Sequence, residues 1–377
     1  MPDAETATPS STARPDSPST RRRYGLDALR GLAVFLMIEQ HVGIWLWRGP
    51  DAGRSLADYP LLVGFNALGG GAAPLFVCLA GVGSALFAAT ARPNRDRTLV
   101  RRGLMLMLFG LALNLATPSW FSWGSWFVLH MMGFAMATAP IWRRMSSRSL
   151  LASCGLVFVG TVMAQHWLET PTLLHNHRMR DLSLPGGTFR LALAEGQFPI
   201  LPWLSFYLAG FVAGRWILAD RPGRIATMGL AFVALGGLGN LLYKLIGPSL
   251  SPEAQKLFFR AFGLQLGFFP ASIAIVGLLL GGALLLVAGM TRLERTRPLG
   301  PANPLVTMGR ASLTLLLLHV PLFREATRPV GLWRGLSAET TLVVVMGVMA
   351  LAMGGSMLWR RRGYRYGAEW LLRRVAG

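Results

Sequence analysis

Long apolar segments separated by short, arginine-rich polar stretches make up most of the chain after residue 28. A helix needs roughly 20 residues to cross the ~30 Å hydrocarbon core of a bilayer, and these segments are close to that length. We therefore predict an all-α polytopic membrane bundle of about ten helices. The predicted spans are 29–47, 66–89, 103–118, 124–141, 150–167, 198–218, 225–246, 268–290, 305–323 and 338–359.

Composition supports a membrane protein. Of the 377 residues, 53% are hydrophobic and 14% are charged, against roughly 25% charged residues in soluble domains. The net charge of +20 comes from arginines clustered between apolar segments, so we expect no nucleic-acid partner. Cys78 and Cys154 both fall inside predicted spans and imply no disulfide framework.

The distribution of lysine and arginine predicts the orientation. With the N-terminus in the cytoplasm, 24 of these residues fall in cytoplasmic segments and 10 in the alternate loops. This bias predicts that both termini are cytoplasmic. We expect a disordered cytoplasmic tail over 1–23, a membrane domain over 24–360 and a basic cytoplasmic tail over 361–377.

The first predicted span carries ionisable residues, which are costly inside a membrane and therefore indicate function. At 100° per residue, Asp27, Arg30 and His41 fall within about 60° of one another, whereas Glu39 points to the opposite face. About 16 Å of helix separates Arg30 from His41. One face thus presents a cation near the cytoplasmic surface and an imidazole deep in the outer half.

Two further histidines, His130 and His319, fall at a depth similar to that of His41. A neutral imidazole can take up a proton near pH 7, so three at one level suggest a polar chamber that opens outward. The alternative is that each is a hydrogen-bonded packing residue. No HExxH motif occurs, and we expect no metal site.

An arginine cluster precedes the third span and includes Arg97, Arg101 and Arg102. The positive-inside rule explains such a cluster. The cluster also suits a phosphate-binding site, because one guanidinium can donate hydrogen bonds to two phosphate oxygens at once. The segment GGGAAPLFVCLAGVGSAL (69–86) allows close helix packing and has no Lys-Ser/Thr pair, so an ATP-binding loop is not expected.

Three segments together resemble the catalytic family of heparan-α-glucosaminide N-acetyltransferase. They are LDALRGLAVFLMIEQH, GGGAAPLFVCLAGVGSAL and RRGLMLMLFGLALN. The ten residues between Arg30 and His41 are also similar to the first-helix motif of the type-three membrane acyltransferases, which belong to the same wider group. The segments FPILPWLSFYLAGFVAGR and MGRASLTLLLLHVPLF resemble later helices, so the resemblance covers about residues 24 to 375.

The resemblance implies a membrane enzyme that moves an acyl group, usually acetyl, from cytoplasmic acyl-CoA to an extracytoplasmic acceptor. The acceptor would be an amine or hydroxyl, often of a sugar. His41 would be catalytic, Arg30 its companion, and Arg97, Arg101 and Arg102 the contacts of the CoA phosphates. Unlike the lysosomal sugar N-acetyltransferases, this chain has no histidine in the loop 48–61, which favours His41 at the first-helix position.

Two mechanisms remain open for His41, which would act either as the general base or as a covalent acyl carrier. Asp27, one turn from Arg30, would orient that arginine. The rival hypothesis is a transporter or flippase for a lipid-linked or polar solute, because intramembrane charges also suit a polar pathway. In either case we expect the plasma (inner) membrane of a bacterium.

Overall fold

The computed structural model describes residues 22–264 and 269–377, and within these residues the regular structure is helical. The fold class is therefore all-α, as predicted. The predicted disordered tail lies outside the described residues except for Arg22 and Arg23. The helices are α1 (Tyr24–Leu46), α2 (Pro60–Gly69), α3 (Ala72–Ala88), α4 (Arg95–Ala116), α5 (Val128–Ala137), α6 (Ala139–Arg144), α7 (Ser147–Trp167), α8 (Gly187–Arg190), α9 (Ile200–Leu218), α10 (Pro222–Ile246), α11 (Pro252–Phe262), α12 (Ile273–Thr296), α13 (Pro304–Arg310), α14 (Ser312–Val320), α15 (Ala338–Arg361) and α16 (Ala368–Ala376).

Eight helices among the described residues are long and apolar enough to cross a membrane. Two predicted spans differ from the expectation. The segment 124–141 forms the short helices α5 and α6, since Pro140 lacks the N–H that a continuous helix would need there. The segment 305–323 bends by 73° between α13 and the helix that follows, so up to nine spans are present.

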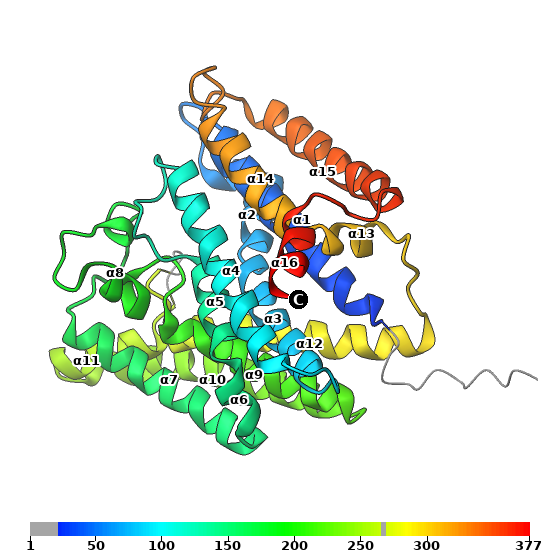
Figure 1. The fold of residues 1–377 in the computed structure, drawn as a ribbon. Coiled ribbons are helices and arrows are strands. Elements are labelled where there is room, and N and C mark those ends of the chain that lie inside the picture. Colours follow the sequence, from blue (N-terminus) through cyan, green and yellow to red (C-terminus); the bar gives the residue numbers. More distant parts are fainter. Residues whose placement is uncertain (1–21, 265–268) are drawn as a thin grey trace, which may run out of the picture.

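Helix α1 lies at the centre of one half of the bundle and packs against α3, α12, α13 and α15 (Figure 1). It approaches α13 closely because both helices present glycine at the crossing. A Cβ at Gly31 would collide with the carbonyl of Leu305, and one at Gly309 with the carbonyl of Asp27. The other half is built on the α3–α9 and α10–α12 pairs.

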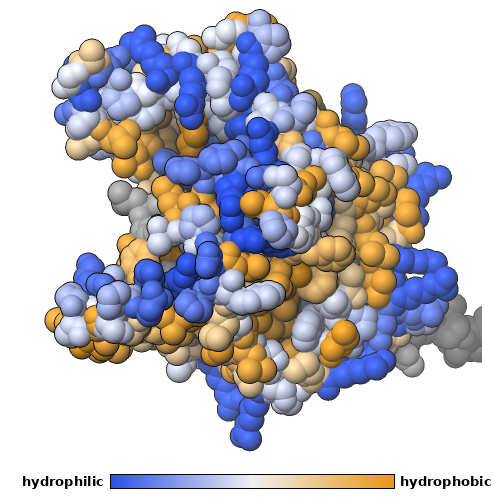
Figure 2. All heavy atoms as spheres, turned by 90° about the vertical axis from the view of Figure 1, so that its left-hand side faces the viewer, coloured by the Kyte–Doolittle hydropathy of each residue, from blue (hydrophilic) through white to orange (hydrophobic). Residues whose placement is uncertain are grey.

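Large apolar side chains cover the outer faces of several long helices. Examples are Leu108 and Leu115 on α4, Leu238 on α10, and Val343 and Leu351 on α15, all more than half exposed. Figure 2 shows broad hydrophobic areas on one side of the molecule, interrupted by hydrophilic patches. Such a surface is suited to lipid rather than water. The chain is an integral, multi-pass membrane protein.

The two ends of the bundle differ. The end at which α1 begins also carries the α3–α4 connection and α16, and we call it the basic end. The other, the loop end, carries the stretches 47–59, 117–127, 168–199 and 326–337. Part of the predicted tail 361–377 folds back at the basic end, because α16 packs against α4 and α14. Its Glu369 accepts hydrogen bonds from the N–H groups of Leu313 (2.6 Å) and Thr314 (3.1 Å) at the start of α14.

Candidate functional site

Two of the three predicted chamber histidines meet. Nδ1 of His41, on α1, lies 2.8 Å from Nε2 of His319, on α14. The rings are nearly parallel, with 8° between their planes. A direct hydrogen bond between two imidazoles fixes both rings and joins them into one proton-holding unit.

The protonation of this pair can be assigned from its hydrogen bonds. Nδ1 of His319 lies 3.1 Å from the carbonyl oxygen of Leu315, which can only accept, so Nδ1 carries the proton. In a neutral His319, Nε2 then accepts a hydrogen bond from Nδ1–H of His41. Nε2 of His41 is left with a free lone pair, which is what a general base requires.

Aromatic side chains surround His41. Its ring stacks on Trp45 with centroids 4.6 Å apart and meets the edge of Trp120 at 5.4 Å. The guanidinium of Arg324 lies 4.9 Å from the ring centre of Trp120 and 4.8 Å from that of Trp333. Trp45, Trp120 and Trp333 thus form an aromatic wall beside the histidine pair, and the buried guanidinium of Arg324 packs against it.

Backbone pairing at the loop end places part of this wall. The N–H of Arg334 donates to the carbonyl of Trp45 (2.8 Å), and the N–H of Leu336 donates to that of Leu46 (3.0 Å). These bonds fasten the loop before α15 to the end of α1. Trp333 therefore lies over the last turn of α1, with its ring centroid 6.4 Å from that of Trp45.

Arg324 is placed by a π-helical turn, Pro321–Glu325, and by the α4–α5 connection. Its Nε donates to the hydroxyl of Ser119 and its Nη2 to the carbonyl of the same residue, both at 3.2 Å. The hydroxyl of Ser119 in turn donates to Glu325 (2.6 Å). Ser119 thus holds the arginine side chain in a single orientation.

The histidine pair opens onto a cavity of about 380 Å³, which we call the loop-end cavity. Apolar and aromatic side chains form most of its lining, with Gln40, Asn176 and Gln197 as polar residues and Arg324 and Arg334 as cations. This combination of an apolar pocket with a few converging polar groups is typical of a small-molecule site.

The loop 168–197 is anchored by a buried carboxylate. Glu195 accepts hydrogen bonds from Arg190 (2.8 Å), Arg178 (3.2 Å) and Thr170 (2.9 Å). Burial raises the pKa of Glu195, but these hydrogen bonds outweigh it and hold the pKa below the ordinary 4.5. The anchored loop supplies Asn176 to the loop-end cavity.

A second cavity of about 350 Å³ lies at the basic end, and we call it the basic-end cavity. Asp27 lines it and is paired with Arg22 (2.8 Å) and with Arg30 (2.9 Å), so the predicted proximity of Asp27 and Arg30 is observed. Its lining includes five arginines and two carboxylates. The arginines are Arg22, Arg30, Arg102, Arg310 and Arg373, and the carboxylates are Asp27 and Glu369.

The three arginines of the predicted phosphate-binding site do not lie together in one cavity. Arg102 lines the basic-end cavity and donates to the carbonyl of Gly377, whereas Arg97 and Arg101 are exposed and do not line it. Arg102 lies at the helix face that looks inward, 4.7 Å from the ring centre of Phe87. Of the three arginines, Arg102 alone is part of the cavity lining.

The two cavities adjoin. Phe76, on α3, and Leu316, on α14, line both of them. The face of α1 that carries Asp27, Arg30 and His41 therefore looks onto two cavities that share these two lining side chains. The basic-end cavity presents five guanidinium groups, whereas the loop-end cavity presents two together with the imidazole of His41 and its free lone pair.

The remaining predicted residues lie apart from these two cavities. His130 lines neither cavity, and its Nδ1 accepts a hydrogen bond from the N–H of Phe127 (3.4 Å) at the start of α5. Glu39 is 2% exposed and likewise lines neither. Its carboxylate oxygens have no hydrogen-bond partner among the described residues.

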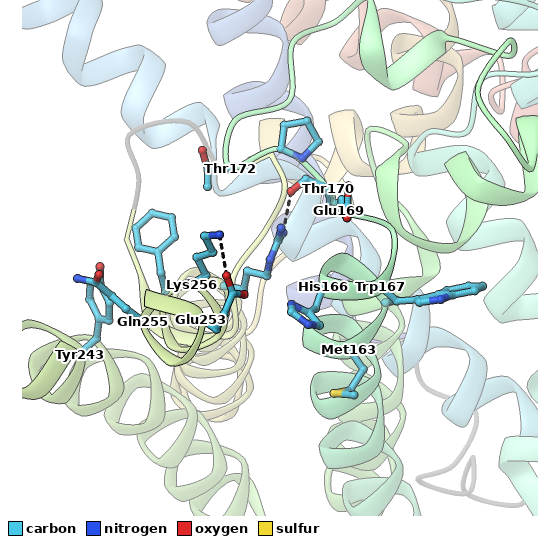
Figure 3. A pocket seen from close by; sticks show the side chains of 14 residues that line it. Met163, His166, Trp167, Glu169, Thr170, Thr172, Tyr243, Glu253, Gln255 and Lys256 are labelled. Atoms are coloured by element: carbon cyan, nitrogen blue, oxygen red, sulfur yellow. Dashed lines mark hydrogen bonds and ion pairs between the residues drawn. The ribbon is translucent and has the colours of Figure 1, made fainter. Parts of the chain in front are cut away.

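A larger, open hollow of about 1390 Å³ lies between α7, α10 and α11 (Figure 3). Its charged residues are largely paired with neighbours: Lys256 binds Glu253 (2.9 Å), and Arg260 donates to the carbonyl of Thr170 (2.7 Å). We place the site at the histidine pair instead, because the volume of a hollow does not by itself indicate a catalytic function. Over the described ranges, no cluster of three or more histidine, cysteine, aspartate or glutamate residues suits a metal ion.

Two family models match the chain. The family model described as "Heparan-alpha-glucosaminide N-acetyltransferase, catalytic" matches residues 22–242, more than half of the chain. The chain belongs to this family. A second model, described as "Protein of unknown function (DUF418)", matches residues 218–377. No curated protein gives a significant match.

Membership of the heparan-alpha-glucosaminide N-acetyltransferase family supports a membrane acetyltransferase-like function, and the family in general uses acetyl-CoA as donor. The candidate site draws on both matched parts. His41 and Trp120 lie in the part that matches this family, and His319, Arg324 and Trp333 lie in the part matched by the second model.

Sequence reasoning missed the aromatic wall and its arginine. Arg324 directly follows the apolar segment that ends at Phe323, and that position in the sequence was its only signal. Trp45, four residues after His41, shares the helical face of that histidine and could have been found from spacing. Trp120 and Trp333 come from loops, and no periodicity points to them.

Proposed function

We propose that the protein moves an acetyl group from acetyl-CoA, bound in the basic-end cavity, to an acceptor held in the loop-end cavity. The observation that carries this proposal is that two chemically different cavities adjoin at Phe76 and Leu316. A thioester entering from the basic end can meet an acceptor entering from the loop end at this junction. The acceptor needs an amine or hydroxyl, and we expect a sugar or glycan.

The basic-end cavity suits the phosphates of the donor. Guanidinium groups bind phosphate oxygens through charge-assisted hydrogen bonds, each contributing roughly 1.5–3 kcal/mol. Five arginines against two carboxylates leave the lining cationic. Arg30 is already bonded to Asp27, so we assign it to holding the first turns of α1 in place beside the donor.

His41 then acts as general base. Its Nε2 takes the proton of the acceptor's hydroxyl or amine while the acceptor's oxygen or nitrogen attacks the thioester carbonyl. The carbon–sulfur bond breaks, and the departing CoA thiolate takes the proton from His41. His319 accepts a hydrogen bond from His41 throughout and stabilises the imidazolium. This hydrogen-bond pattern favours His41 as a general base over His41 as a covalent acyl carrier.

The proposal requires the basic end to face the cytoplasm, where acyl-CoA is found, and the excess of lysine and arginine there supports this orientation. Reporter fusions after residues 145 and 377 should read cytoplasmic, and one near residue 180 should read external. An external C-terminus would reverse the direction of transfer. We expect the membrane to be the plasma (inner) membrane of a bacterium.

The direct test uses purified protein in lipid nanodiscs with radiolabelled acetyl-CoA and a panel of glycans, lipids and amines. We expect CoA release that depends on acceptor and the appearance of an acetylated product. His41→Ala should lose roughly 10²–10⁴-fold in rate while still binding acetyl-CoA. Full activity in a folded His41→Ala variant would overturn the mechanism. Solute movement without any CoA release would point to a transporter instead.

A further inference from the structure

The lining of the loop-end cavity carries positive charge only among the described residues. Among the described residues that line it, the formally charged ones are Arg324 and Arg334. The charged groups that act on Arg324 are mostly of the same sign, namely Arg328, Arg180 and Arg334, with Glu325 as the exception. The carboxylate of Glu325 already accepts the N–H (3.2 Å) and hydroxyl (2.6 Å) of Ser119.

Arg324 has unused hydrogen-bonding capacity. The residue is only 9% exposed. Nε and Nη2 bond to Ser119, but Nη1 has no hydrogen-bond partner among the described residues. A buried, unpaired cation is costly unless an anion completes it. The planar guanidinium, fixed between Trp120 and Trp333, is suited to a carboxylate, sulfate or phosphate group.

The same charge works against an ammonium group. Two like unit charges about 6 Å apart, at an effective dielectric constant of about 20, repel strongly enough to weaken binding roughly a hundredfold. An amine acceptor that is protonated near pH 7 would bind more weakly because of this repulsion, or would have to lose its proton before binding. A hydroxyl is neutral, and His41 can deprotonate it during attack.

From this charge distribution, and resting on the proposed function, we infer that the acceptor is an anionic, hydroxyl-bearing molecule that the protein O-acetylates. Arg324 binds the anionic group and thereby presents a neighbouring hydroxyl to Nε2 of His41. The oxygen–acyl bond forms as the carbon–sulfur bond breaks, and the hydroxyl proton leaves with CoA through His41. Carboxylate, sulfate and phosphate share the oxyanion chemistry that Arg324 recognises.

Three methyl glycosides with the same ring separate the possibilities: methyl glucuronide, methyl glucoside and methyl glucosaminide. With acetyl-CoA at pH 7, we expect kcat/KM for the anionic glucuronide to exceed that for the neutral glucoside roughly ten- to hundredfold, as for one charge-assisted interaction. The cationic glucosaminide should be the poorest acceptor. The product should be a hydroxylamine-labile ester.

Arg324→Gln should abolish the preference for the glucuronide over the glucoside, as measured by the ratio of their kcat/KM values. Arg54→Gln, at an exposed arginine that does not line the cavity, is the matched control and should keep the preference. Tryptophan fluorescence gives a readout that needs no catalysis. Methyl glucuronide should quench the cavity tryptophans of the parent and bind at least tenfold more weakly to Arg324→Gln. Retained acetyl-CoA binding shows that the variant is folded.

The outcomes separate this inference from the proposed function. Efficient acetylation of the glucosaminide as a stable amide, or an unchanged preference in Arg324→Gln, would overturn the anionic acceptor and leave the acetyltransferase intact. If the parent cleaves no acetyl-CoA with any acceptor yet binds the glucuronide through Arg324, the proposed function fails and the anion site stands.

Discussion

The hydrogen bond between His41 and His319 gives the most direct test of how the site works. His319→Leu removes the acceptor of Nδ1–H of His41 and leaves an apolar side chain of similar size. His41 can then adopt the other tautomer, in which Nε2 carries the proton and cannot act as a base. The imidazolium formed during the reaction also loses its partner.

The magnitude follows from the geometry. A 2.8 Å nitrogen–nitrogen hydrogen bond that becomes charge-assisted when His41 is protonated contributes about 1.5–3 kcal/mol. That corresponds to a loss in kcat of roughly ten- to 150-fold. The loss should be smaller than for His41→Ala, because the base itself is still present in His319→Leu.

The assay is acceptor-dependent release of CoA thiol by the purified protein, with acetyl-CoA affinity measured separately. His319→Gln is the matched control, since its amide oxygen can accept from Nδ1–H of His41 in place of Nε2. We expect His319→Gln to recover most of the lost rate and acetyl-CoA binding to remain unchanged in both variants. If His319→Leu turns over within twofold of the parent, the imidazole pair has no part in proton transfer.

Three further predictions test the basic-end cavity and the loop that shapes the acceptor site. Gly83→Leu should raise the Kd for acetyl-CoA at least tenfold, because Gly83 lines the basic-end cavity and a Cβ there already lies 3.0 Å from Nη2 of Arg30, so a leucine would fill space that the donor needs. Gly354→Leu, where a Cβ meets nothing within 4 Å, should leave the Kd measured by titration calorimetry unchanged. Arg102→Gln should weaken acetyl-CoA binding by roughly ten- to 150-fold, whereas equal weakening by the exposed Arg97→Gln would refute the assignment of Arg102. Glu195→Ala should cost about 1.5–3 kcal/mol in a thermal-unfolding assay, because the half-buried Arg190 and Arg178 lose their carboxylate partner. Since the pKa of Glu195 is lowered in the folded state, its contribution is present above the ordinary pKa and lost as pH falls through the folded value, so the variant's deficit should shrink in acid.

The sequence predicted the helical membrane fold, because the hydrophobic length of each segment can be read without knowing its neighbours. It also placed Asp27 and Arg30 one turn apart on the face that carries His41, since helical spacing converts directly into geometry. Those three residues do lie along the two adjoining cavities. Local pattern was also misleading in places: the apolar segments 124–141 and 305–323 look continuous, yet each breaks.

Which distant residues share the site depends on the tertiary structure. His319 is 278 positions from His41, and Trp120 and Trp333 lie in loops whose positions depend on pairing with other elements. His130 has the same predicted depth as His319, but α5 directs it toward Phe127 and away from both cavities. Depth along a membrane normal can be read from one segment. Rotation and lateral position depend on how every helix packs against its neighbours, and that information is spread over the whole chain.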